Sequence, residues 1–121
     1  MEQYVKVETH AGKRYLASRS SKHFIRTQQD ILDLLAWGYK NETNLFLLED
    51  TDFVSEFYDL RTGLAGEILQ KVSNYSARLA IVGSFKMVET RRFGELMVES
   101  NKGSQVRFAR SEDEAISWLV K

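Results

Sequence analysis

The alternation of short apolar runs with helix-period stripes constrains the fold of this chain most. NLFLLE at 44–49 and RLAIV at 78–82 are continuous apolar runs, which are typical of strands that are covered on both faces. Between them, Leu64, Ile68 and Val72 recur at intervals of four, which predicts an amphipathic helix. A strand, a helix and a second strand in this order form a right-handed crossover between parallel strands. The sequence therefore predicts an α/β fold around a mostly parallel sheet.

The rest of the chain continues this alternation. The further predicted elements are a hairpin of strands at 4–8 and 13–18, a helix from Thr27 to about Asn41, a helix through Phe93, Leu96 and Met97, a strand at 105–109 and a final helix from Ser111 through Leu119. Thr27 with Asp30, and Ser111 with Glu114, have the spacing of capping boxes. We therefore expect one domain over residues 1–121, with the order ββαβαβαβα, about five strands in a mixed sheet and four helices.

Two details concern the helix surfaces and ends. In the first helix the apolar stripe begins at Ile31, and Trp37 or Tyr39 is expected to extend it. Gly103 follows the third helix, where glycine commonly takes the left-handed conformation. The chain has no proline, so Gly, Asn, Ser and Thr must set its turns and helix ends.

Composition excludes several classes of function. Seventeen Lys and Arg balance seventeen Asp and Glu, so net charge gives no reason to expect binding to nucleic acid. The absence of cysteine excludes disulfides, thiolate nucleophiles and zinc sites built on sulfur. No apolar run approaches the roughly 18 residues of a membrane span, and the polar start MEQYVKVETH does not read as a signal peptide. We expect a cytoplasmic protein without membrane insertion.

The stretch FYDLRTGLAGEILQKVSNY at 57–75 is the candidate site, because an acidic loop becomes a helix there. A helix start presents free backbone N–H groups and the positive end of the helix dipole. Thr62 could cap those groups, and glycines allow another backbone to approach closely. The candidate binding residues are Phe57, Tyr58, Asp59, Arg61, Thr62, Gly63, Gly66 and Glu67. The segment is either a closely packed helix start or a site for an anion, a phosphate or a partner.

No motif of the chain indicates catalysis or a bound cofactor. The two glycines of GLAG do not have the spacing of either standard phosphate-binding loop, and no G-x-S-x-G elbow is present. His10 and His23 lie far apart and lack metal-ligand spacing. Glu49, Asp50 and Asp52 follow a predicted strand, and we expect them to be solvated rather than to bind a cation. We therefore expect no catalytic residue, no metal and no cofactor.

Apolar and aromatic residues gather just before the glycine segment. Phe53, Val54, Phe57 and Tyr58 could be half-exposed anchors for a protein partner or an apolar ligand. They could equally close the end of the sheet as part of the core. A third possibility is a homodimer in which this aromatic loop is the interface.

Two resemblances bear on the fold and the function. DLRTGLAGEILQKVSNYSARLAIVG, ESNKG and QVRFARSEDEAISWL, within residues 44–120, resemble a family of small bacterial domains of unknown function. More distantly, the chain is similar to the STAS domain of anti-sigma-factor antagonists and its SpoIIAA-like relatives. There, a D-S-[ST]-G-L-G segment opens the second helix, and phosphorylation of its first hydroxyl residue breaks partner binding. Aligned on Gly63, Thr62 matches the second hydroxyl residue, Arg61 the phosphorylated one and Leu60 the aspartate. This resemblance implies a STAS-like fold and partner binding at this loop, without the phospho-acceptor.

These observations give two hypotheses of different classes. The first is a non-enzymatic, STAS-like binding or regulatory module for an unknown protein partner, whose surface includes residues 53–62 and the start of the second helix. The alternative is a small-molecule or lipid-binding domain, or a small enzyme. It would use Asp59, Arg61, Thr62 and Glu67 in one pocket at the carboxyl ends of the strands.

Overall fold

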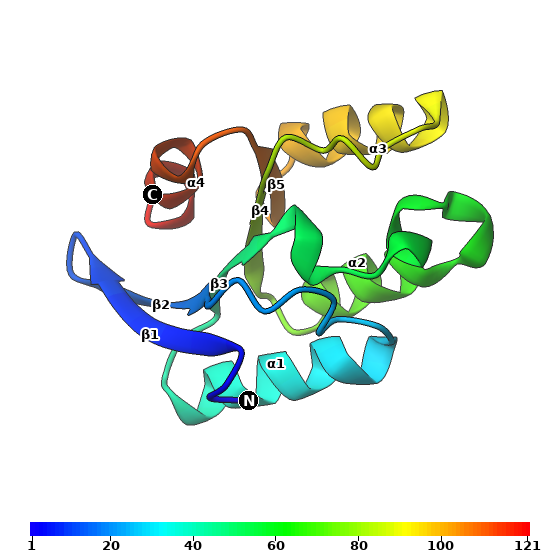
Figure 1. The fold of residues 1–121 in the computed structure, drawn as a ribbon. Helices are drawn as coiled ribbons and strands as arrows, with labels where there is room; N and C mark the ends of the chain where they lie inside the picture. The colour runs from blue at the N-terminus through cyan, green and yellow to red at the C-terminus, as the bar shows by residue number, and fades with distance from the viewer.

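A five-stranded sheet with four α-helices forms the structure, a computed structural model that describes residues 1–121 (Figure 1). The strands are β1 (Val5–His10), β2 (Lys13–Ser18), β3 (Leu45–Glu49), β4 (Arg78–Val82) and β5 (Val106–Ala109). The helices are α1 (Gln28–Lys40), α2 (Leu64–Asn74), α3 (Arg91–Lys102) and α4 (Glu112–Leu119). The predicted α/β class and the order ββαβαβαβα are confirmed.

The strands lie in the sheet in their order along the chain, from β1 at one edge to β5 at the other. β1 and β2 pair antiparallel, and all other neighbours pair parallel. Right-handed crossovers that all advance in one direction place their helices on the same face of a sheet. Accordingly, α1, α2 and α3 cover one face, while α4 lies on the other face beside the β1–β2 hairpin (Figure 1).

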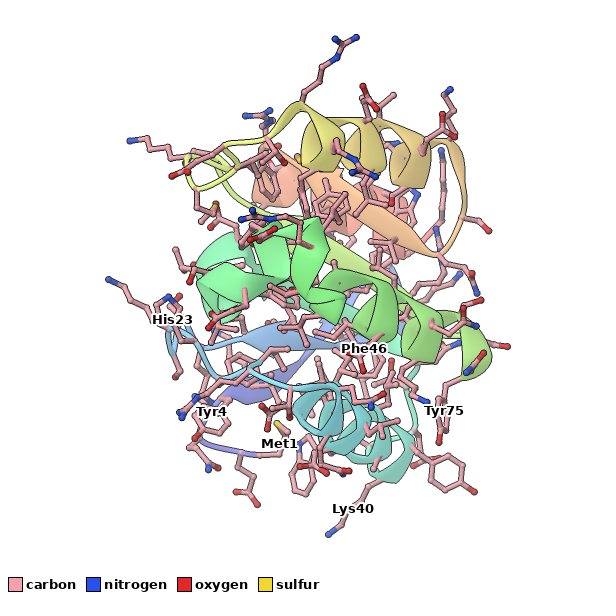
Figure 2. All side chains as sticks on the ribbon, turned by 90° about the vertical axis from the view of Figure 1, so that its right-hand side faces the viewer. Met1, Tyr4, His23, Lys40, Phe46 and Tyr75 are labelled. Atoms are coloured by element: carbon pink, nitrogen blue, oxygen red, sulfur yellow. The ribbon has the colours of Figure 1, made fainter.

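Each face of the sheet has its own apolar layer. Figure 2 looks onto the side of α1, α2 and α3, where the larger core includes Phe46 of β3. Leu47, the next residue of β3, belongs to the smaller layer under α4. Ala17, Ala80 and Ala109 supply the sheet side of that smaller layer, and their short side chains let α4 approach the sheet closely. β3 and β4 are therefore covered on both faces, as their apolar runs predict.

Local capping sets the start of α1 and of α4. The Thr27 hydroxyl accepts a hydrogen bond from Asp30 N at 3.4 Å, and the Asp30 carboxylate accepts one from Thr27 N at 3.1 Å, so this capping box is confirmed. Ser111 Oγ accepts from Glu114 N at 3.1 Å. The Glu114 carboxylate reaches Arg110 N, at 3.4 Å, instead of the backbone of Ser111. Ser111 and Glu114 therefore cap α4, but the Glu114 carboxylate accepts its hydrogen bond from the residue before the N-cap.

The structure decides one alternative that the sequence left open for α1 and differs from the prediction at Gly103. Tyr39 is 88% exposed, because the stripe of α1 turns toward the sheet at Gly38 and half-buried Trp37 extends it instead. Gly103 takes an extended conformation, with φ −92° and ψ −170°. It leads the chain directly into β5, and its N–H donates to Ser100 O at 3.0 Å, so no left-handed turn is needed.

Candidate functional site

The candidate segment forms a tight turn before α2. One turn of 3₁₀-helix spans Leu60–Thr62, and Gly63 follows with φ +79°, in the left-handed region that favours glycine. α2 begins at Leu64, so Gly63 is the N-cap residue instead of Thr62. The Thr62 hydroxyl still accepts from Leu64 N at 3.3 Å and so pairs one free N–H group of the helix start.

An ion pair between the exposed side chain of Arg61 and the half-buried side chain of Asp59 holds the outer side of this turn. Arg61 Nε and Nη2 donate to the two carboxylate oxygens of Asp59 at 2.9 and 2.8 Å, and Arg61 N donates to Asp59 Oδ1 at 3.0 Å. These hydrogen bonds from Arg61 hold the pKa of the Asp59 carboxyl below its usual range. The side chain of Arg61 is 88% exposed, so its guanidinium can reach another molecule without a change of fold.

The Thr62 hydroxyl fixes the inner side of the turn. Its Oγ1 lies 2.7 Å from Glu56 O and 2.9 Å from Asp59 O, so its proton is donated to backbone carbonyls of the preceding turns. The side chains of Arg61 and Thr62 are thus both held by residues within six positions of them in the chain.

The first turn of α2 continues this exposed region. Gly66 and Glu67 are exposed, and a Cβ atom built on Gly66 would meet no atom within 4 Å. We call the solvent-accessible part of residues 59–67 the entry surface, in which Asp59 is half-buried and the other members are exposed. Its members are Asp59, Arg61, Thr62, Gly63, Gly66 and Glu67.

The aromatic residues before the turn lie in the core. Phe57 is 0% exposed, and its ring stacks on Phe53 at a centroid distance of 4.3 Å and meets the edge of Phe93 at 5.7 Å. Tyr58 is 4% exposed and donates its hydroxyl hydrogen bond to Asp50 O at 2.5 Å. Of the alternatives for these aromatics, closure of the end of the sheet is therefore the one observed. Phe57 and Tyr58 support the entry surface from beneath and do not contact solvent as anchors.

The acids that follow β3 are buried, so the expectation that they are solvated is wrong for two of them. A 3₁₀ turn over Asp50–Asp52 folds the chain back at the end of the strand, which leaves Asp50 7% and Asp52 0% exposed. Asp50 Oδ2 accepts from Phe85 N at 3.0 Å. Asp52 Oδ2 accepts from Glu49 N at 2.7 Å, but its Oδ1 has no hydrogen-bond partner. Burial raises the pKa of Asp52 to about 6.

A cavity of about 520 Å³ lies at the carboxyl ends of β3 and β4, on the α4 face of the sheet. Its position is the one that the pocket hypothesis predicts, but its residues are different. None of the four residues named for that pocket lines it, namely Asp59, Arg61, Thr62 and Glu67. Tyr15 and Glu112 do line it, and the sequence analysis does not single them out. One wall of the cavity could have been predicted from the hairpin. Glu8 pairs with Tyr15, and strand alternation places paired residues on the same face of the sheet.

One family model matches nearly the whole chain, over residues 10–119, and its description is "Domain of unknown function (DUF4180)". The chain belongs to the DUF4180 family. The expectation of a family of unknown function is thus confirmed, and the match extends toward the hairpin beyond the resemblance at 44–120. No curated protein and no solved structure matches the chain.

Two kinds of feature are absent from this DUF4180 chain. No group of three or more His, Asp or Glu side chains is placed to hold a metal ion. None of its helices combines the length and the apolar character that crossing a membrane requires.

The buried carboxyl of Asp52 predicts a pH dependence for this DUF4180 domain. Its folded pKa of about 6 lies above the value of 3.8 for a free carboxyl, so the folded state holds the proton more tightly. Asp52 therefore contributes most stability below pH 4, and this contribution is lost as the pH rises through 6. We expect Asp52→Asn to raise the free energy of unfolding at pH 7 by about 1–2 kcal/mol and to flatten its slope between pH 4 and 6.

Urea denaturation at a series of pH values measures this effect. Asp33→Asn, at an exposed position of α1, is the control and should keep the slope of the wild type. An Asp52→Asn slope equal to that of the wild type would show that Asp52 is ionised in the fold at low pH.

Proposed function

We propose that this DUF4180 chain is a STAS-like, non-enzymatic regulatory module of the bacterial cytoplasm that binds a protein partner through the entry surface. The observation that carries this proposal is the rigid, exposed turn at the start of α2. The resemblance of the sequence to STAS domains at the start of the second helix also supports the proposal.

Preorganisation is the first support for binding at this surface. The Asp59 and Thr62 side chains bond to the turn itself, and buried Phe57 and Tyr58 anchor the turn from below. A surface that is already ordered loses little conformational entropy when a partner binds. The exposed guanidinium of Arg61 adds a residue type that is enriched at interface hot spots.

Gly66 is the second support. A glycine inside a helix lowers stability by roughly 0.5–1 kcal/mol relative to alanine. Open space surrounds the position of a Cβ at Gly66, so packing within the chain gives no reason for the missing side chain. A bare helix surface does allow the backbone of another molecule to approach closely. Gly94 of α3 is equally open, but only Gly66 adjoins the hydrogen-bonded turn of Asp59, Arg61 and Thr62, and we infer that the partner covers Gly66.

The chemistry of the turn favours constant binding over a phosphorylation switch. Arg61 stands where the STAS motif has its phosphorylated hydroxyl residue, so that acceptor is lacking. The Thr62 hydroxyl is held by the carbonyls of Glu56 and Asp59, where it stabilises the turn. Control of binding at this site would therefore act through the partner or through the amount of protein.

Variants of Gly66 test this proposal by separating stability from binding. Gly66→Ala should raise the free energy of unfolding by about 0.5–1 kcal/mol, because alanine favours the helix and meets no atom. Gly66→Gln should likewise fold, but its longer side chain should reduce recovery of the cross-linked partner by about tenfold. Urea denaturation and quantitative mass spectrometry of cross-linked proteins measure the two effects.

Gly94 of α3 offers a matched control, because it also lies near a helix start and a Cβ there would meet no atom within 4 Å. Gly94→Ala and Gly94→Gln should fold and should keep partner recovery. Equal loss of recovery in the Gly66 and Gly94 variants would contradict a specific role for the entry surface.

A further inference from the structure

The cavity at the carboxyl ends of β3 and β4 is separate from the entry surface. The β1–β2 hairpin forms one wall and the start of α4 the other, on the side of the sheet away from α1, α2 and α3 (Figure 1). Ala17, Leu47 and Val82 give it an apolar floor. Its volume of about 520 Å³ lies within the roughly 300–1,000 Å³ of small-molecule sites.

Tyr15 lines this cavity with a polar group that the chain does not use. The residue as a whole is only 5% exposed, but its hydroxyl oxygen reaches the solvent of the cavity and makes no hydrogen bond within the protein. Glu8 and Glu112 line the same cavity, and burial and then their charges raise the pKa of this hydroxyl. A hydroxyl that opens into a cavity and has no partner in the chain is free to pair with a ligand there.

Other polar groups of the cavity already have partners. Asp50 accepts from Phe85 N, and Glu49 accepts from the Ser20 hydroxyl. Lys6 Nζ lies 3.7 Å from Glu8 Oε1. Glu112 forms no ion pair. The groups free to meet a ligand are therefore the Tyr15 hydroxyl and the Glu112 carboxylate.

The lining of the cavity is mainly acidic, which favours a positively charged ligand. Four carboxylates face one ammonium group among the lining residues, which are Lys6, Glu8, Tyr15, Ala17, Ser18, Ser20, Leu47, Leu48, Glu49, Asp50, Val82, Gly83 and Glu112. A hollow lined mainly by one sign of charge concentrates counter-ions of the other sign. A tyrosine ring beside carboxylates also suits an ammonium group, which the face of the ring attracts.

We propose that this cavity binds a small aliphatic amine, whose ammonium group lies between Tyr15 and Glu112 and whose hydrocarbon chain lies on the apolar floor. The site uses no residue of the entry surface, so it is a second function in addition to partner binding. Amine binding here does not depend on whether the entry surface binds a partner.

Titration with three four-carbon probes tests the class of ligand. Butylammonium, butanol and butyrate have similar length but carry a positive charge, no charge and a negative charge. In ¹H–¹⁵N NMR spectra, we expect butylammonium to shift the amide signals of Tyr15, Ala17 and Gly83 in a saturable way. Equal shifts with butanol would make the cavity a plain apolar site and overturn the proposal, as would stronger binding of butyrate or no saturable shift with any probe.

Two variants and one matched control test the assigned residues. Glu112→Gln should weaken butylammonium binding by about tenfold, because it removes a charge-assisted hydrogen bond. Tyr15→Phe keeps the ring and should weaken binding about threefold. Asp113→Asn changes an exposed acid on the same turn that does not line the cavity, so it should leave affinity unchanged. Equal weakening by Asp113→Asn and Glu112→Gln would show that only general electrostatic attraction acts, and the assignment would fail.

Discussion

Replacing Phe57 by alanine is expected to lower the free energy of unfolding by about 3–5 kcal/mol. The ring is fully buried, and it contacts Phe53, Tyr58 and Phe93, so truncation leaves a cavity where the loop before α2 meets α3. A typical domain has only about 5–15 kcal/mol of stability, so much of it would be lost. Urea denaturation followed by circular dichroism measures the change.

Tyr75 provides the aromatic control for this prediction. It lies at the end of α2 and is 61% exposed (Figure 2), so Tyr75→Ala should change stability by less than about 0.5 kcal/mol. A Phe57→Ala variant as stable as the wild type would contradict the buried position. The expected loss also means that Phe57→Ala cannot test partner binding, because it disturbs the fold first.

Replacing Gly38 by alanine is expected to lower the free energy of unfolding by about 1–3 kcal/mol, although alanine is the better helix former. A Cβ atom at this position would lie 2.4 Å from Phe46 Cζ and 2.8 Å from Thr43 O. The backbone oxygen cannot move away without a shift of the chain that leads into β3. The close approach of α1 to the sheet therefore outweighs helix propensity.

The same denaturation assay compares Gly38→Ala with Gly66→Ala, and the two should change stability in opposite directions. Helix propensity is the same for both substitutions, so only the surroundings of each glycine differ. A gain in stability from Gly38→Ala would contradict the packing of α1 against Phe46.

The fold could be predicted from the sequence because its signals are local. The apolar runs at 44–49 and 78–82 needed cover on both faces, and the structure provides it. The polar pair of Thr27 and Asp30 set the start of α1 without help from distant residues. Strand and helix patterns alternate along the sequence after the hairpin, and this alternation is what predicts a mostly parallel sheet.

The loop between β3 and α2 could not be predicted in the same way. Its aromatic and acidic residues show no helix or strand period, and three short 3₁₀ turns decide which of them face inward. Asp52 and Phe57 are buried there by tertiary packing, which composition alone does not reveal. The exposed members of the entry surface were identified because glycines and caps mark a helix start locally.

The lining residues of the cavity were missed for a different physical reason, although its place at the carboxyl ends of the strands was predicted. Its walls come from segments that lie almost a whole chain apart, because Tyr15 belongs to the hairpin and Glu112 to the last helix. Tyr15 and Glu112 lie at the same cavity only because α4 packs on the second face of the sheet, beside the hairpin. The spacing of residues in the sequence does not indicate on which face of the sheet α4 packs.

Partner recovery with a charge-reversed Arg61 tests the central claim most directly. Wild type, Arg61→Glu and the control Arg91→Glu should be cross-linked in cells and their captured proteins quantified by mass spectrometry. Arg91 is a suitable control because it is 92% exposed at the start of α3 and pairs with Glu95, much as Arg61 pairs with Asp59. We expect Arg61→Glu to fold and to lose the partner by about tenfold or more, while Arg91→Glu retains it. Equal recovery with Arg61→Glu and the wild type would contradict partner binding at the start of α2.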